Sequence, residues 1–313
     1  MYPMEQFLTF DIGADPYAGI SANVKLDDLP LKQEVTPKLS IMMSCFHRYS
    51  QLQRTLETLC RQDFKDFEVL IYDNDDDQHL EEVVAQFDPY LHIQFFKKSG
   101  GVRRFDPSAA FKFMFPHTHG KVVAIMQPEC MLYRNATYWL YHGHEDEKWI
   151  ENDALSIYNI ENALKAPVKD WNLAETCVTL KTLWSSPRMQ KGIDLYDWHD
   201  DIKNLYEMSG FWDEGCGLAN FSNTVWCYNY DIQIWWLVFS FKRTAKIWED
   251  MPELLGHASI DFFMINYREI MNYIDVMPYE PLAFHQDHHR MSVSPEGDQA
   301  SVSKEELRRK FLK

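Results

Sequence analysis

Polar, charged and aromatic side chains follow three apolar segments in the first half of the chain. They are Ser44, Phe46 and Arg48 after residues 39–43, Asp73 and Asn74 after residues 67–72, and Gln127 and Glu129 after residues 121–126. Carboxylates accept hydrogen bonds and bind hard divalent cations, and an aromatic ring can stack on a planar ligand. These residue types can therefore build a site for a polar ligand, provided that the fold brings the three segments together.

The segments that carry these residues have the pattern of an α/β fold. Runs rich in branched apolar residues predict strands over 39–43, 67–72, 91–96 and 121–126, and amphipathic spacing predicts helices near 50–59, 80–87 and 109–115. Ser50, with Gln53 three residues later, predicts a capping box at the first helix. Strands alternating with helices predict a mostly parallel sheet flanked by helices, whose ligand site lies at the carboxyl ends of the strands.

Residues 39–136 resemble the nucleotide-binding half of the family-two glycosyltransferases, which have the GT-A fold. Residues 40–48 stand where the family has a strand followed by Pro-Thr-Tyr/Phe-Asn-Arg, and residues 67–77 stand where it has a strand and an Asp-Asp-Gly-Ser turn. Residues 122–129 occupy the place of the strand that carries the Asp-x-Asp metal motif. The resemblance implies a Rossmann-like GT-A fold.

Two later segments continue the resemblance in the family's order. Residues 259–263 are similar to the acidic Glu-Asp-x-Asp segment, and residues 284–286 are similar to the segment that carries the family's late histidine. The resemblance implies that Asp261 is the catalytic base, although an alternative alignment places the base at Ser259. In total, the similar segments cover roughly half of the chain, and no single motif is a full match.

The departures from the family pattern bear on the metal. Gln127 stands where the first carboxylate of the metal motif is expected, and Glu129 keeps the remaining acid. The resemblance implies that Mg²⁺ or Mn²⁺ is held by Glu129, by His285 and by the phosphates of the donor. His288 is the alternative histidine in the same histidine-rich segment.

The implied activity is transfer of a sugar, with inversion, from a nucleotide-diphosphate donor such as a UDP-sugar to an acceptor hydroxyl. Phe46 would stack on the nucleobase, Asp73 would accept a hydrogen bond from it, and Arg103 or Arg104 would offset charge on the leaving diphosphate. The residues implied to bind the nucleotide-sugar are Ser44, Phe46, Arg48, Asp73, Asn74, Arg103, Arg104 and Gln127. Simpler interpretations stay open, in which Phe46 is core, Asp73 belongs to a solvated turn, Glu129 is a surface acid and Asp261 caps a helix.

The chain beyond residue 136 is rich in tryptophan. Aromatic faces beside carboxylates suit sugar recognition, so Trp212, Asp213 and Glu214 are predicted to contact a glycan or glycoconjugate acceptor. The predicted organisation is an arm over residues 1–36 packed on the domain and a nucleotide-sugar-binding half over residues 37–136. An acceptor-binding and catalytic half over residues 137–292 and a polar tail with a short helix over residues 293–313 complete it.

Composition restricts the class of protein. The 313 residues include 46% hydrophobic residues, enough for one sizeable core, and the formal net charge of −16 opposes non-specific binding of nucleic acids or anionic lipids. Six cysteines without a CxxC pair, no apparent signal peptide and no membrane-length apolar run predict a cytoplasmic protein with reduced thiols.

Two other functions stay open, and the sequence leaves the oligomeric state undetermined. The first is a glycosyltransferase of the kind that viruses encode, acting on modified bases in DNA. The second is a non-catalytic relative that binds a nucleotide or serves as a scaffold, which the altered motif at residues 127–129 favours.

Overall fold

The computed structural model describes most of the first half of the chain and selected segments of the second. The described residues are 26, 29–46, 48–74, 78–97, 107–132, 134–144, 155–158, 176–180, 182–185, 225–226, 238–252, 263–264, 267–268, 270–271, 273–278, 282–285 and 309–310. Several predicted site residues lie outside these ranges, namely Arg103, Arg104, Trp212, Asp213, Glu214 and Asp261. His285 lies in a described strand, and its backbone pairing is known.

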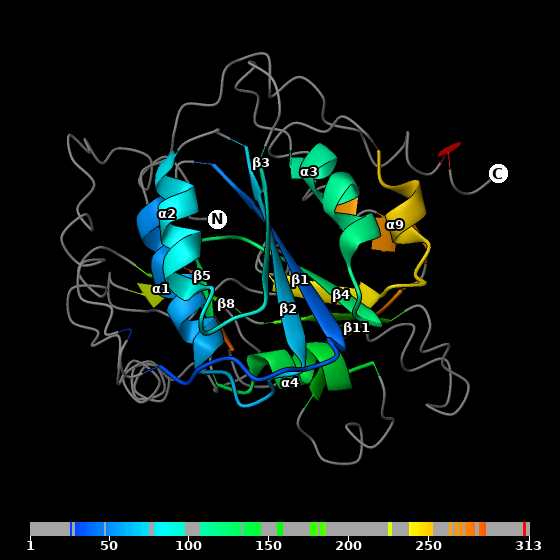
Figure 1. The fold of residues 1–313 in the computed structure, drawn as a ribbon. Coiled ribbons are helices and arrows are strands. Elements are labelled where there is room, and N and C mark those ends of the chain that lie inside the picture. Colours follow the sequence, from blue (N-terminus) through cyan, green and yellow to red (C-terminus); the bar gives the residue numbers. More distant parts are fainter. Residues whose placement is uncertain are drawn as a thin grey trace.

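Four parallel strands form one half of an eight-stranded sheet (Figure 1). They are β1 (Leu39–Cys45), β2 (Phe67–Asp73), β3 (Ile93–Lys97) and β4 (Val122–Met126), in the order β3-β2-β1-β4. Every residue of β1 and β4 is buried, as expected for strands covered by helices on both faces. The predicted α/β fold with a mainly parallel sheet is confirmed, and the four strand positions were predicted within about two residues.

The sheet continues beyond β4 through strands from the second half of the chain. Next to β4 comes β10 (Val238–Lys242), followed by β7 (Thr176–Thr179), β11 (Ile274–Pro278) and β6 (Leu155–Tyr158). β10 is antiparallel to both of its neighbours, β11 is parallel to β7, and β6 is antiparallel to β11. The second half of the chain thus completes the same sheet.

A smaller second sheet, which the sequence did not predict, joins distant segments. Its order is β5 (Cys130–Leu132), β12 (Ala283–His285), β8 (Thr182–Ser185) and β9 (Val225–Trp226). The antiparallel pairing of β12 with β5 places His285 opposite Cys130. Residues near the end of the chain are thereby held beside the segment that follows β4.

Helices cover the two faces of the parallel strands (Figure 1). One face carries α1 (Tyr49–Cys60), α2 (Gln78–Phe87) and α4 (Ala136–His142). The other carries α3 (Pro107–Met114), which continues as a 3₁₀ turn over Phe115–His117, and the short α9 (Ile247–Asp250).

β1 shows how the sequence builds both layers. Ile41 and Met43 belong to the cluster packed with α1 and α2, whereas Met42 belongs to the cluster packed with α3. This alternation follows from the two-residue period of a strand, which sends successive side chains to opposite faces. A central strand buried on both faces therefore has mostly apolar residues at successive positions of its sequence.

The start of α1 differs from the prediction. The helix begins at Tyr49, so Ser50 lies inside it, and Arg48 is the N-cap residue without a side-chain capping bond. The backbone N–H of Leu52 donates to the carbonyl of Arg48 at 2.8 Å, which fixes the cap two residues before Ser50. The predicted capping box is wrong because the chain turns into the helix sooner after β1. Of the predicted C-terminal helix, Arg309 and Lys310 are described, and both are helical.

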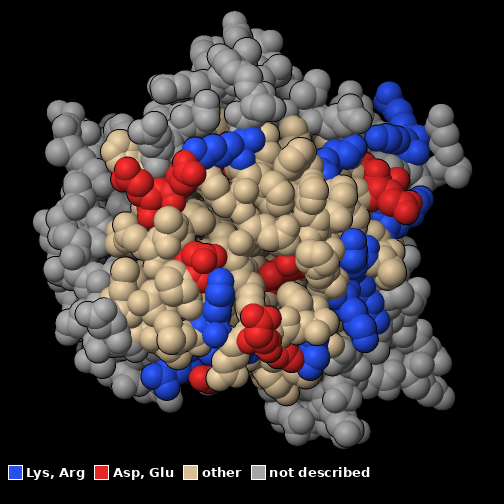
Figure 2. All heavy atoms as spheres, in the orientation of Figure 1, with Lys and Arg blue, Asp and Glu red and all other residues tan. Residues whose placement is uncertain are grey.

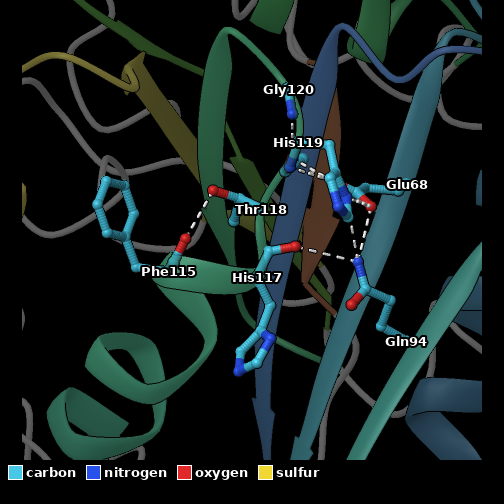
Figure 3. Close-up of polar contacts among 8 residues, drawn as sticks. Glu68, Gln94, Phe115, His117, Thr118, His119 and Gly120 are labelled. Atoms are coloured by element: carbon cyan, nitrogen blue, oxygen red, sulfur yellow. Dashed lines mark hydrogen bonds and ion pairs between the residues drawn. The ribbon is translucent and has the colours of Figure 1, made fainter.

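One buried carboxylate holds together the edge of the sheet at which the parallel strands begin (Figure 3). Glu68 of β2 accepts hydrogen bonds from Ser40 Oγ at 2.7 Å, Gln94 Nε2 at 2.8 Å, and the backbone N and Nδ1 of His119 at 2.7 and 2.9 Å. Burial raises the pKa of Glu68, but these hydrogen bonds outweigh burial and hold the pKa below its ordinary value. Gly120 donates its N–H to Ser40 Oγ at 2.8 Å and approaches β1 so closely that a Cβ would lie 2.6 Å from the backbone nitrogen of Ser40. We call this group, Ser40, Glu68, Gln94, His119 and Gly120, the Glu68 network.

Candidate functional site

The carboxyl ends of β1, β2 and β4 meet at one edge of the sheet. The register pairs Cys45 with Asp73 across β1 and β2, and Met42 with Ile125 across β1 and β4. Residues 44–46, 48, 73–74 and 127–129 therefore lie at or just after the ends of three adjacent strands, and we call them together the carboxyl edge. This arrangement agrees with the rule that α/β sheets bind ligands outside the carboxyl ends of their strands.

The ends of β1 and β2 are joined by hydrogen bonds. The side-chain amide of Asn74 donates to Ser44 Oγ, and the backbone N–H of Asn74 donates to the carbonyl of Cys45 at 2.9 Å. Both side chains are buried, and the neighbouring Asp73 is fully buried. Asp73 is therefore not part of a solvated turn, and direct contact of Asp73, Ser44 or Asn74 with a nucleotide would require this edge to rearrange.

The thiol of Cys45 lies among charged groups from all three strand ends. Burial raises the pKa of Cys45 far above its ordinary value, and the negative charges of Glu129 and Asp73 raise it further. A hydrogen bond from the backbone of Arg48, together with the positive charge of that residue, acts in the opposite direction. Asp73, Glu129 and Arg48 thus lie close enough to one buried thiol for their charges to act on it.

An ion pair connects two of the predicted ligand-binding residues. Arg48 Nε lies 3.9 Å from Glu129 Oε1, and both side chains are largely shielded from solvent, at 15% and 10% exposure. This separation is longer than a hydrogen bond, although attraction between charges is strong in such a shielded place. Glu129 is therefore not a surface acid, and the positively charged guanidinium of Arg48 lies next to it.

A polar row on α1 holds the segment that carries Glu129. Thr55 Oγ1 donates to the carbonyl of Pro128 at 2.8 Å, and Thr58 Oγ1 accepts a hydrogen bond from the N–H of Leu132 at 3.0 Å. Gln62 donates to the carbonyl of Leu132 at 3.3 Å and accepts from the N–H of Thr137 at 3.1 Å. We call Thr55 and Thr58 of α1, together with Gln62, which lies two residues beyond the end of the helix, the α1 polar row.

The sequence analysis missed the α1 polar row, although a signal for it was present. The three residues recur at spacings of three and four, the spacing of one helix face, although the helix itself ends at Cys60. They are fully or almost fully buried. Buried polar residues on a helix need partners, and here these partners are backbone groups of the chain that follows β4.

The segments that carry the two predicted metal ligands, Glu129 and His285, lie side by side. The backbone of His285 pairs with that of Cys130, the residue after Glu129, so the two predicted metal ligands come from adjacent segments. The part of the chain that the structure describes contains no group of three or more His, Cys, Asp or Glu residues that could hold a metal by itself. The residues present fit a cation only if the ligand's own oxygens supply much of the coordination.

The remaining predicted residues are placed as follows. Phe46 and Gln127 are half-buried residues directly after β1 and β4. Arg103, Arg104 and Asp261, like the predicted acceptor residues Trp212, Asp213 and Glu214, lie outside the described residues. The structure therefore brings together seven candidate residues, Ser44, Phe46, Arg48, Asp73, Asn74, Gln127 and Glu129, and the roles of the other candidates stay predictions.

A family model matches the part of the chain that builds the carboxyl edge. Residues 40–136 match the family described as Glycosyl transferase family 2. These residues are similar to the family 2 glycosyltransferases. The match confirms the resemblance and the enzyme class inferred from the sequence, at the level of this domain.

One curated relative supports the same assignment over a shorter stretch. An 83-residue segment is 32% identical to the chondroitin synthase of Escherichia coli, which corresponds to 26% of this chain and 12% of that enzyme. The chain thus spans a small part of the length of this relative.

Solved structures of low sequence identity share the fold. S. aureus TarS (residues 1–349), in complex with UDP-GlcNAc, has a TM-score of 0.50 and 13% identity, with 87% of this chain and 64% of that chain covered. GalNAc-T7 with UDP, GalNAc and Mn²⁺ has a TM-score of 0.50 and 12% identity, with coverage of 93% and 52%. These similarities confirm the GT-A fold expected from the sequence.

Proposed function

We propose that the protein is an inverting glycosyltransferase that moves a sugar from a nucleotide-diphosphate donor, a UDP-sugar, to a hydroxyl of a glycan or glycoconjugate. The observation that carries this proposal is the convergence of Asp73, Asn74, Arg48 and Glu129 at the carboxyl edge of a family 2 domain. UDP-GlcNAc in the TarS complex supports the choice of donor, and the name of chondroitin synthase supports a glycan acceptor.

In this proposal, residues of the carboxyl edge bind and orient the donor. Phe46 stacks on the base, and Ser44, Asn74 and Gln127 hydrogen-bond to the nucleotide. Arg48 offsets the growing negative charge on the leaving diphosphate, helped by Arg103 or Arg104.

We propose Mg²⁺ or Mn²⁺ as the cofactor, with Glu129 and His285 as its protein ligands. A bound cation would offset charge on the leaving diphosphate. The adjacent backbones of His285 and Cys130 support this assignment, as does the Mn²⁺ in the GalNAc-T7 structure. Arg48 lies beside Glu129, so the protein already supplies a positive charge at this position.

The acceptor side of the site is proposed from the sequence, over residues 137–292. Asp261 takes the proton of the attacking hydroxyl, while Trp212, Asp213 and Glu214 bind the acceptor sugar. We expect Asp261→Asn to lower the turnover number by about 10²- to 10⁴-fold, the contribution typical of a general base. Donor affinity, measured by calorimetry, should stay unchanged, and an unaltered turnover number would assign the base elsewhere.

The test of the proposed function is transfer by the purified protein. UDP-sugars with and without Mn²⁺ are incubated with glycan acceptors, UDP release is measured, and the anomeric configuration of the product is read by NMR. Acceptor-dependent UDP release with inversion supports the proposal. Binding of UDP without transfer to any acceptor would instead identify a non-catalytic relative, and transfer only to DNA with modified bases would identify the viral type of activity.

We also propose a reducing, cytoplasmic setting for the protein. Cys45, Cys60, Cys130 and Cys177 are buried free thiols, and the described residues contain no disulfide. No helix in the described ranges is long and apolar enough to cross a membrane. Labelling of thiols in freshly lysed cells would show blocked cysteines if the protein matured in an oxidising compartment.

A further inference from the structure

A cavity lies at the opposite edge of the sheet from the carboxyl edge. Its walls are the start of β4, the end of β10 and the end of α4, and its volume is about 540 Å³. A volume of this size is within the usual range of small-molecule sites. None of the residues assigned to the donor site lines it.

Three cationic residues line the cavity. Lys121 precedes β4, Lys242 ends β10 and Arg243 follows it, and the N–H of Arg243 donates to the carbonyl of Lys121 at 2.8 Å. Among the described residues, no carboxylate forms an ion pair with any of the three, and Arg243 lies 5.9 Å from the ring of Phe115. Figure 2 shows several lysine and arginine side chains on the right of the described surface, with an acidic group among them, and others elsewhere on the same face. In a chain of net charge −16, this local excess of positive charge favours an anion.

His144 adds a hydrogen-bond acceptor to the same cavity. Its Nε2 lies 3.0 Å from Ser240 Oγ, and that hydroxyl donates to the carbonyl of Leu140 at 2.8 Å. Because the hydroxyl proton of Ser240 is already used, Nε2–H of His144 must be the donor to Ser240. Burial, and then the charge of Lys242, lower the pKa of His144 to about 3, so the ring is neutral and Nδ1 carries a lone pair.

The lone pair of Nδ1 requires a donor that the described part of the chain does not provide. His144 is 1% exposed, and Nδ1 has no hydrogen-bond partner there. A buried acceptor without a partner costs free energy, which a hydroxyl of a ligand would recover. The cavity therefore combines cations for an acidic group with an acceptor for a hydroxyl.

We propose that this cavity is a second binding site, which takes an anionic sugar unit, a hexose phosphate or a hexuronate. Its acidic group binds Lys121, Lys242 and Arg243, and one hydroxyl donates to His144 Nδ1. A hexose phosphate and a hexuronate share the same recognised groups, a ring with hydroxyls and one acidic group. The site is separated from the carboxyl edge by the length of β4, five residues or roughly 17 Å, so both sites can be filled together.

The test is calorimetry of the whole chain with matched probes. Glucose 6-phosphate and glucuronate carry both features, inorganic phosphate carries only the anion, and glucose carries only the hydroxyls. We expect at least one of the first two to bind about tenfold or more tightly than either partial probe, since a hydrogen bond to a charged group contributes about a tenfold gain or more. Whichever of the two binds identifies the source of the acid. Equal affinity for glucose 6-phosphate and inorganic phosphate, together with no binding of glucuronate, would overturn the proposal.

Substitutions of lining residues test whether the probe binds in this cavity. Lys242→Gln and Lys121→Gln should each weaken the bound probe about tenfold, whereas Lys246→Gln, which lies outside the cavity and beside Asp250, should leave affinity unchanged. Saturating UDP should not displace the probe, because the donor site lies at the other edge. Displacement by UDP, or equal losses in the Lys246 control, would refute a second site. Because UDP binding is measured separately, failure of this proposal does not affect the proposed transferase activity.

Discussion

Each edge of the parallel strands contains a shielded glutamate, and the two glutamates differ in the contacts of their carboxylates. At the amino edge, Glu68 accepts four hydrogen bonds of 2.7–2.9 Å, so its charge is fixed by neighbouring strands. At the carboxyl edge, Glu129 lies 3.9 Å from Arg48, beyond hydrogen-bond distance. The four short hydrogen bonds of Glu68 serve the register of the sheet, whereas the longer Glu129–Arg48 ion pair is a contact that a ligand can replace.

Among the changes that compare the two edges, Glu129→Gln should have the largest effect on activity. The change keeps the size of the side chain and removes the charge, so we expect kcat/KM for donor to fall by about 100-fold, typical of a preorganised electrostatic group. The thermal midpoint should change little. Steady-state kinetics at several Mn²⁺ concentrations checks this, and a metal dependence identical to that of the wild type would remove Glu129 from the metal site.

Glu68→Gln is the matched change at the amino edge, with the opposite expected outcome. An amide cannot accept all four hydrogen bonds, so we expect the free energy of unfolding to fall by about 2 kcal/mol. The KM for donor should remain close to that of the wild type. Urea denaturation and kinetics of the two variants side by side test the comparison, which fails if both lose activity to the same degree.

Sequence patterns predict the carboxyl edge better than the amino edge. β1 to β4 are apolar runs closed by polar residues, so their order and the residues at their carboxyl ends follow from local patterns. The Glu68 network depends on where His119 and Gln94 lie in space, and nothing in the local sequence of β2 indicates it. The small second sheet is harder still, because β5 and β12 are short and about 150 residues apart in sequence.

Thr55→Val tests whether the α1 polar row positions Glu129. The substitution keeps the shape of the buried side chain and removes the hydrogen bond to the carbonyl of Pro128. We expect donor affinity in the presence of Mn²⁺ to weaken about fivefold, since one neutral hydrogen bond contributes about 1 kcal/mol. Affinity without metal should stay the same, because the loss acts through the turn that carries Glu129.

Ser108→Ala is the control for this change. Ser108 is also fully buried on a helix, but it lies on α3, on the other face of the sheet. Its removal should not alter the metal-dependent part of donor binding. Equal effects of Thr55→Val and Ser108→Ala would mean that the α1 polar row acts only on stability.

Acid unfolding measures the Glu68 network directly and should give the smallest effect. The pKa of Glu68 is lower in the folded protein than its ordinary value of 4.5, so the folded state binds this proton less tightly than the unfolded chain. The stabilising contribution is therefore complete above pH 4.5 and is lost as the pH falls through the folded pKa. The glutamine at position 68 of the Glu68→Gln variant does not titrate, so the difference in unfolding free energy between this variant and the wild type should shrink as the pH falls below 4.5. A difference that is constant across this range would mean that the network stabilises the sheet by packing rather than by holding a charged carboxylate.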